Sequence, residues 1–426
     1  MFLIKQISFF IVYSLYYIII RYSYYDYVAF NFSSFGFRNN NIPLLYELCV
    51  FVFVFLIICL LPRKITQASQ LMCSFLCVFI YLPFSIIIFR INSEWIDFNQ
   101  AFVMWIFVSV GMIIIISSLY IKRGVINIGN KIKPVYLIYI TAILSMYFIS
   151  VTLSNFTLVG IEQLTELNDV RSNSKISGIS AYVYLWLISV LLPYTIGILV
   201  HNKKSMYGIL FSFIYVYFSF SMGAKILLVA PITFIAIYIW IYRYKMHTRY
   251  LFSGVILFII SLYFLGVFFP EQIYFAKALF LFRTISIPNL GFAIYFDYFN
   301  DNTFTYFTHI GVVADIFSIK NDIPLPVRLH LWYGLGNFNA NFIVNDGYAS
   351  LGFIGIIIIS IIYSGIGYVL DVCSKGKSRI VVFFSLVYII MFQANISLFT
   401  LLLSHGLVFL PLLYIFVSDD LNEKVL

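Results

Sequence analysis

Residues 71–89 read LMCSFLCVFIYLPFSIIIF and contain no charged side chain. A helix of this length, at about 1.5 Å per residue, covers a hydrocarbon layer about 30 Å thick. Similar apolar runs follow one another along the chain, at residues 7–20, 43–61, 71–89, 101–120, 135–152, 180–200, 206–220, 226–242, 250–269, 350–370, 380–394 and 398–417. The sequence therefore predicts an all-α polytopic membrane protein of about twelve transmembrane helices in one domain, residues 1–426.

The composition agrees with a location in the lipid bilayer. The chain of 426 residues is 62% hydrophobic, 20% aromatic and only 10% charged, and its mean hydropathy is +1.00. Soluble domains carry about 25% charged residues, so the composition excludes a soluble protein. No small-residue cleavage site follows the first apolar run, which predicts a retained first helix rather than a signal peptide.

The net charge of +9 does not indicate a nucleic-acid partner, because the basic residues form short clusters between apolar runs. With the amino terminus in the cytoplasm, the clusters at Arg63, Lys122, Lys203, Arg243 and Lys375 all fall on the cytoplasmic side. The positive-inside rule therefore predicts that both termini are cytoplasmic. The five cysteines lie in or beside apolar runs, which indicates neither disulfides nor a metal site.

Two polar segments are expected on the outer face, the loop 153–179 and the longer segment 270–349, which precedes the last three helices. Structureless loops of such length are uncommon unless they are functional. We predict that segment 270–349 is a large periplasmic loop with one or two interfacial helices, broken at Pro288. The alternative is that part of it spans the membrane, which would move Lys375, Lys377 and Arg379 to the outside.

Several classes of catalytic motif are absent from the sequence. It contains no P-loop, dinucleotide fingerprint or nucleophile elbow, no internal repeat, and no paired aspartates of the kind that hold a metal with a sugar nucleotide. We therefore expect chemistry that needs no cofactor, metal or nucleotide.

Four cations on the outer side are candidate ligands of an anionic substrate: Arg171 in LNDVRSNSK, Lys225 in SFSMGAK, Arg283 in ALFLFRTISIPN and Arg328 in PLPVRLHLWYG. A guanidinium forms paired, charge-assisted hydrogen bonds with a diphosphate. The alternative for Arg171 is a solvated loop charge paired with Asp169. For Arg283 and Lys225 the alternative is a side chain that extends from the membrane edge to water.

Candidate proton-transfer and sugar-binding groups lie in the segment 270–349. His309 and His330 are possible bases, although a lone histidine is more often structural. In GLGNFNANFIVNDGYASLGFIG, Asn339, Asn341 and Asp346 offer the amide and carboxylate groups that bind sugar hydroxyls. The alternative is an ordinary loop that caps the following helix.

Four stretches carry a resemblance to a known family: NDVRSNSK, SMGAKILL, LFRTISIPNLGFAIYFDYF and NANFIVNDGYASLGFIG. Together with a helix number near twelve and a large outer loop late in the chain, they make the sequence similar to the O-antigen polymerase (Wzy-type oligosaccharide repeat-unit polymerase) family. The resemblance implies a GT-C-like fold in the bacterial inner membrane and a glycosyltransferase of lipopolysaccharide biosynthesis.

Such an enzyme transfers the growing glycan from undecaprenyl diphosphate to the next undecaprenyl-diphosphate-linked repeat unit, at the periplasmic face. The resemblance implies roles for the candidate residues. The diphosphates would be bound by Arg171, Arg283 and Lys225, and Arg283 would also stabilise the leaving group. Further contacts with substrate would come from Arg328, Asn339 and Asn341, and the base would be Asp169, His309, His330 or Asp346. A chain-length regulator and a flippase are the partners that the family implies.

Two other functions remain open. A flippase of lipid-linked oligosaccharide also has about a dozen helices, but it needs charges along a central cavity, whereas this sequence concentrates charge outside its apolar runs. A membrane O-acyltransferase needs a histidine near the membrane, and His201 and His247 lie in plain basic loops.

Overall fold

The computed structural model describes residues 2–40, 42–124, 126, 131–156, 176–318, 323–335 and 340–421, without the side chains of residues 2–6, 155, 225, 226 and 312. This part of the chain is helical, and its only β pairings are isolated bridges. Nine helices within it are long and apolar enough to cross a membrane. The prediction of an all-α polytopic membrane protein is therefore confirmed.

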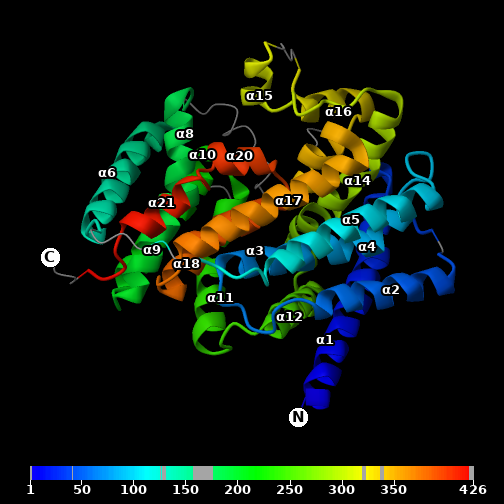
Figure 1. Ribbon diagram of the computed structural model, residues 1–426, viewed down its shortest axis with the longest axis horizontal. Helices are drawn as coiled ribbons and strands as arrows, with labels where there is room; N and C mark the ends of the chain where they lie inside the picture. Colours follow the sequence, from blue (N-terminus) through cyan, green and yellow to red (C-terminus); the bar gives the residue numbers. More distant parts are fainter. Residues whose placement is uncertain are drawn as a thin grey trace.

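The amino-terminal half contains α1 (Phe2–Ser23), α2 (Leu44–Cys59), α3 (Ala68–Leu76), α4 (Leu82–Ile87), α5 (Phe98–Ser118), α6 (Pro134–Thr152), α8 (Ile179–Trp186), α9 (Leu192–His201), α10 (Ser205–Met222) and α11 (Ala230–Tyr242). The rest contains α12 (Thr248–Phe268), α13 (Pro270–Lys277), α14 (Ile287–Asp301), α15 (Gly311–Ile316), α16 (Leu325–Tyr333), α17 (Ala349–Cys373), α18 (Arg379–Ser385), α19 (Val387–Phe392), α20 (Leu398–Leu403) and α21 (Phe409–Phe416). Figure 1 shows α17 running diagonally through the middle of the bundle.

Three of the long helices continue through a proline. Pro83, Pro193 and Pro288 each stand in the first turn of an α-helix that directly follows a π-helical segment. A proline lacks an N–H and its ring collides with the carbonyl four residues earlier. The wider π turn moves that carbonyl away. The predicted break at Pro288 is therefore wrong, because η9 (Ala278–Ser286) joins α13 and α14 into one helix, Pro270–Asp301.

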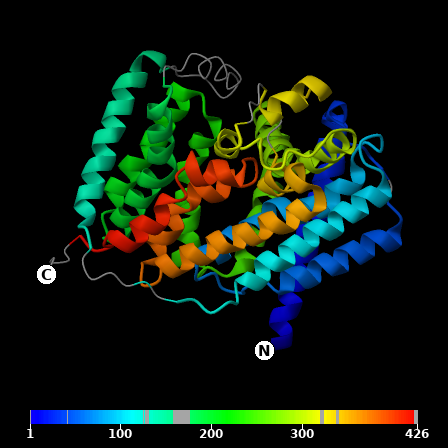
Figure 2. The ribbon, with the colours of Figure 1, turned by 45° about the horizontal axis from the view of Figure 1, so that its top comes forward.

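The contacts between helices define two faces of the bundle. Helix α5 runs parallel to α17, with Phe107 stacked on Phe353 at 4.6 Å, and Figures 1 and 2 show the two side by side. Helix α3 begins where α17 ends, because Ser69 binds Asp371. We call the end that holds residues 62–70, 119–123 and 371–379 the basic face.

The long helix Pro270–Asp301 does not move the basic residues that follow it to the opposite face of the bundle. Lys375, Lys377 and Arg379 line the same pocket as Lys122 and Arg123, on the basic face. Asp419, near the carboxyl terminus, also lies there, because its carboxylate accepts the backbone N–H of Ser378. The alternative that moved these three cations to the other face is therefore wrong. The assignment of the basic face to the cytoplasm stays a prediction.

The last apolar run, 398–417, differs from the prediction because it forms two short helices. Gly406 has a φ of 73°, and the N–H of Leu407 reaches back to the carbonyl of Leu401. This is the geometry of a helix that ends at a left-handed glycine. The structure therefore does not reproduce a count of twelve spans.

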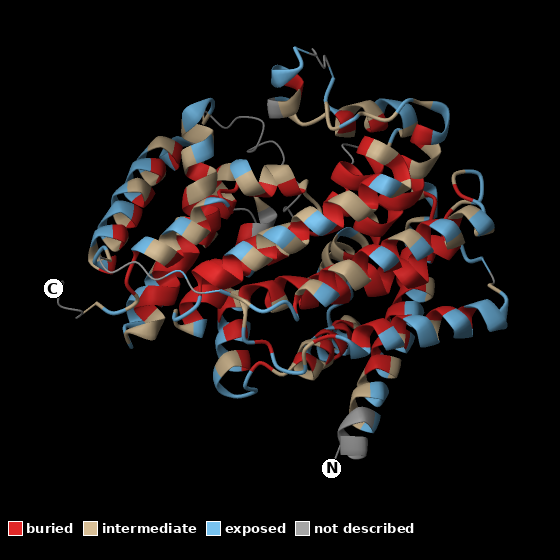
Figure 3. Cartoon of the chain, in the orientation of Figure 1, coloured by how far each residue is buried: buried red, intermediate tan, exposed pale blue. Residues whose placement is uncertain are grey.

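A re-entrant segment, which we define as residues 340–350, is the main feature that the sequence did not predict. It contains the π-helix η10 (Ile343–Tyr348), and every one of its residues is buried (Figure 3). The chain reverses at Leu351 and Gly352, where φ of Gly352 is 62°. Phe342 stacks on Tyr363 at 4.7 Å. From Gly352 to Tyr363, α17 rises roughly 16 Å, so the segment folds back along α17 by about that depth.

The close packing of this hairpin depends on two glycines, and it yields a stability prediction. A Cβ atom on Gly355 would lie 2.0 Å from the carbonyl oxygen of Gly347. Replacing Gly355 by Ala should destabilise the protein by about 1–3 kcal/mol, because this backbone has no room to yield. The measurement is thermal unfolding in detergent. Gly365→Ala on the same helix meets nothing within 4 Å and should not lower stability. Equal effects of the two changes would contradict the close contact.

Candidate functional site

The re-entrant segment brings two predicted residues together, His309 and Asp346. His309 Nε2 lies 3.7 Å from Asp346 Oδ1, and the two side chains are 9% and 0% exposed. Neither of these two atoms has a hydrogen-bond partner in the described part of the chain. The other carboxylate oxygen, Oδ2, accepts the backbone N–H of Leu398, at the start of α20. A buried acid and base with one unpaired atom each is a strong candidate for a reactive centre.

Thr305 holds one ring nitrogen of His309. Its hydroxyl lies 2.7 Å from His309 Nδ1 and 3.0 Å from the carbonyl oxygen of Ala349, which also accepts the Thr305 N–H. The hydroxyl has one proton, so when it donates to Ala349, Nδ1 is the donor to the hydroxyl oxygen and Nε2 carries the lone pair. In the other tautomer the hydroxyl donates to Nδ1, and the Nε2–H group faces Asp346. Nε2, the atom that faces the carboxylate, is therefore the ring nitrogen at which a proton can be exchanged.

The turn that carries His309 is strained. Tyr306 and Phe307 have φ values of 50° and 65°, in the left-handed region that residues other than glycine rarely adopt. Hydrogen bonds from the N–H groups of Thr305 and Tyr306 to Ala349 and Ser350 hold the turn against the re-entrant segment. Strain of this kind is often found at functional sites.

The two asparagines of the re-entrant segment are engaged within the fold. Asn341 accepts the N–H groups of Ile343 and Val344 and donates to the carbonyl of Pro288. Asn345 accepts the hydroxyl of Tyr295 at 3.3 Å. Both ends of the Asn341 amide are therefore used to fix the segment. This gives Asn341 a positioning role in the structure, and the predicted contact with substrate stays a prediction.

The other predicted site residues do not join the His309–Asp346 pair. Arg283 is exposed on η9, and no described acidic side chain pairs with it. It precedes Pro288, whose carbonyl accepts a hydrogen bond from Asn341 of the re-entrant segment, by about 8 Å of helix. Arg328 and His330 lie on α16, at the upper edge in Figure 1. The predicted residues that lie outside the described part are Asp169, Arg171 and Asn339, together with the side chain of Lys225.

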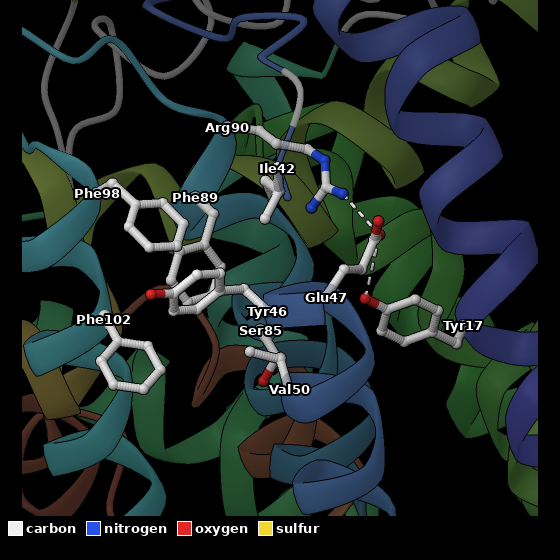
Figure 4. A pocket seen from close by; sticks show the side chains of 10 residues that line it. All are labelled: Tyr17, Ile42, Tyr46, Glu47, Val50, Ser85, Phe89, Arg90, Phe98 and Phe102. Atoms are coloured by element: carbon white, nitrogen blue, oxygen red, sulfur yellow. Dashed lines mark hydrogen bonds and ion pairs between the residues drawn. The ribbon is translucent and has the colours of Figure 1, made fainter. Parts of the chain in front are cut away.

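A second charged centre was not predicted. Glu47 on α2 binds both Arg90, at 2.8 Å, and Arg21, at 3.0 Å. The Arg90 side chain is only 1% exposed, and its Nε also donates to Tyr25 (2.7 Å). Figure 4 shows Glu47 between Arg90 and Tyr17. A sequence signal for this centre exists, because Glu47 is the one charged residue inside the apolar run 43–61, and such a charge needs a partner.

The cavity beside Glu47 and Arg90 has a volume of only about 10 Å³, which is about the space that one water molecule occupies. Aromatic side chains, including Phe98 and Phe102, close it. It is too small for a sugar or a diphosphate. We therefore interpret the Glu47–Arg90 pair as a structural element of the fold.

The fold and the site define a polytopic α-helical membrane protein with a buried His309–Asp346 pair inside the bundle. Among the described residues, no group of three or more His, Cys, Asp or Glu side chains could hold a metal ion. No protein-family model, curated protein or solved structure matches the chain.

Proposed function

We propose that the protein is a glycosyltransferase of the bacterial inner membrane that polymerises lipid-linked O-antigen repeat units at the periplasmic face. The observation that carries this proposal is the buried His309–Asp346 pair, with its two unpaired atoms, at the end of α17 away from the basic face. The resemblance noted in the sequence and the many apolar helices support the membrane setting. A GT-C-like arrangement and about twelve spans belong to the same proposal.

The proposed reaction uses His309 as the base. A hydroxyl of the acceptor sugar lies between His309 Nε2 and Asp346 Oδ1 and gives its proton to Nε2. Its oxygen then forms a bond to the anomeric carbon of the donor glycan, and the bond from that carbon to the diphosphate oxygen breaks. Asp346 stabilises the imidazolium as it forms, which is the usual role of a carboxylate next to a catalytic histidine. The diphosphate leaves as an anion and needs no general acid.

The absence of a contact between Arg283 and the pair, among the described residues, suggests a specific role for this arginine. A diphosphate on the reacting sugar must lie next to the base, whereas Arg283 lies on η9, which contributes no contact to His309 or Asp346 in the described ranges. The acceptor carries its own diphosphate, separated from the reacting hydroxyl by the length of a short oligosaccharide. We assign Arg283 to the acceptor's diphosphate, and Arg171 and Lys225 to that of the donor.

Replacing Arg283 by Ala should lower kcat/KM for the acceptor about 10²-fold, with most of the loss in KM, because the lost contact forms before the reaction as well as during it. Arg283→Lys should retain part of the activity, since it keeps the charge but loses the paired hydrogen bonds. The assay is polymerisation of purified lipid-linked repeat units by the protein in detergent. Full activity of Arg283→Ala would remove it from the mechanism.

One observation favours the alternative of a flippase. The re-entrant segment and the short helix α20 meet at Asp346, where the N–H of Leu398 points at its carboxylate. Transporters often build their substrate sites from such broken helices.

The lipopolysaccharide ladder of cells in which the gene is deleted and then restored distinguishes the two functions. A polymerase deletion leaves core capped by one repeat unit, and the long chains return on complementation. Loss of even the single capped unit would indicate flipping and contradict the proposal. An unchanged ladder would exclude both.

A further inference from the structure

A second pocket lies on the basic face, at the end of α17 away from His309 and Asp346. Its volume is about 580 Å³. Three separate segments build it, residues 66–70 before and within α3, residues 119–123 after α5, and residues 371–382 from the end of α17 into α18. Roughly 30 Å of helix separates it from the reactive pair. The pocket is therefore independent of the transfer chemistry proposed above.

The side chains around this pocket are strongly basic. Five cations line it, together with one acid: Lys122, Arg123, Lys375, Lys377, Arg379 and Asp371. The polar side chains of Thr66, Gln67, Gln70 and Ser374 complete the lining. Those of Thr66, Gln70 and Ser374 already donate within the pocket wall, to Gln70, Gln67 and the carbonyl of Asp371, so the cations are the groups left to meet an anion. A concave site with an excess of positive charge attracts anions.

The one acid of the pocket cannot repel an anion effectively, because its charge is already balanced. Asp371 is 0% exposed and accepts the N–H and the hydroxyl of Ser69 as well as the Arg123 guanidinium, whose Nε lies 3.0 Å away. Lys377 is paired in turn with Asp419 at 3.2 Å. These ion pairs fix the back of the pocket, and each of them is neutral overall. The net positive charge of the pocket therefore comes from the other cations.

The remaining cations are Lys122, Lys375 and Arg379. All three are exposed, and none of them lies within ion-pair distance of an acidic side chain in the described ranges. They come from two segments that are distant in sequence, after α5 and around the α17–α18 turn. Like charges brought together in this way repel one another unless an anion lies between them.

We propose that this pocket binds a phosphate group, carried either by an anionic lipid headgroup or by a soluble phosphate compound. Lysine and arginine side chains are the groups that recognise phosphate oxygens. The pocket is on the face predicted to be cytoplasmic, where anionic lipids attract basic clusters.

The test compares the full chain with two variants, purified in a neutral detergent at low salt. The pocket variant is Lys122→Gln/Lys375→Gln/Arg379→Gln. The matched control is Lys203→Gln/Lys204→Gln/Arg243→Gln, which removes two lysines and one arginine that are also exposed, from loops on the same face. Binding is measured as the shift in thermal unfolding with short-chain phosphatidylglycerol, with phosphatidylcholine, and with inorganic diphosphate.

We expect phosphatidylglycerol or diphosphate, but not phosphatidylcholine, to stabilise the wild type and the control, with binding roughly 100-fold weaker in the pocket variant. Stabilisation by phosphatidylglycerol alone identifies a lipid headgroup, and stabilisation by diphosphate alone or by both identifies phosphate that need not be part of a lipid. Equal loss of binding in both variants, retention of binding in the pocket variant, or no response of the wild type to either anion would overturn the proposal.

Discussion

Replacing Asp346 by Asn, or His309 by Gln, should lower the rate of polymerisation about 10²- to 10⁴-fold, which is the usual contribution of a positioned base. Asn at position 346 still offers an oxygen to the N–H of Leu398, so the fold is preserved while the negative charge is lost. Gln at position 309 removes the imidazole ring whose Nε2 faces Asp346. The readouts are the lipopolysaccharide ladder of complemented cells and the turnover of purified lipid-linked repeat units.

The matched control for this prediction is His330→Gln. His330 was an equal candidate in the sequence, but it lies on α16 and no contact joins it to Asp346. It should retain most of the activity. Thermal unfolding in detergent must show that the Asp346 and His309 variants are folded. Wild-type rates in folded His309→Gln, or inactivity of His330→Gln alone, would refute the assignment of the base.

The second large effect concerns stability. Replacing Glu47 by Ala should destabilise the protein by about 3–5 kcal/mol, because it leaves the guanidinium of Arg90 buried without a counter-charge. Arg21→Gln should cost less than about 1 kcal/mol, since Arg21 is 44% exposed and Glu47 keeps its ion pair with the buried Arg90. Thermal unfolding of the purified proteins and their yield from membranes measure both effects.

A double variant separates the charge from the packing at this centre. Glu47→Leu/Arg90→Met removes both charges and keeps apolar volume, so it should be more stable than Glu47→Ala. If the double variant is as unstable as the single one, lost packing rather than an unpaired charge explains the effect. A Glu47→Ala protein as stable as Arg21→Gln would show that the ion pair contributes little.

The pattern of apolar runs in the sequence predicted where helices form better than it predicted where they widen, bend or end. Apolar runs mark helices because each helix satisfies its own backbone hydrogen bonds, and this is a local property. The π-helical turns before Pro83, Pro193 and Pro288 were not predicted, since whether a proline breaks or only widens a helix depends on packing around it. Similarly, Gly406 divides a run that was predicted to form one helix.

For the candidate site, the sequence by itself determined that this is a membrane protein, where its basic clusters lie, and that His309 and Asp346 are among a few groups able to transfer a proton. Only the tertiary structure placed His309 beside Asp346, and it alone joined Glu47 to Arg90. The reason is physical. Periodicity and charge are local, whereas a side-chain pair distant in sequence exists only where a chain reversal, such as that at Gly352, brings its members together.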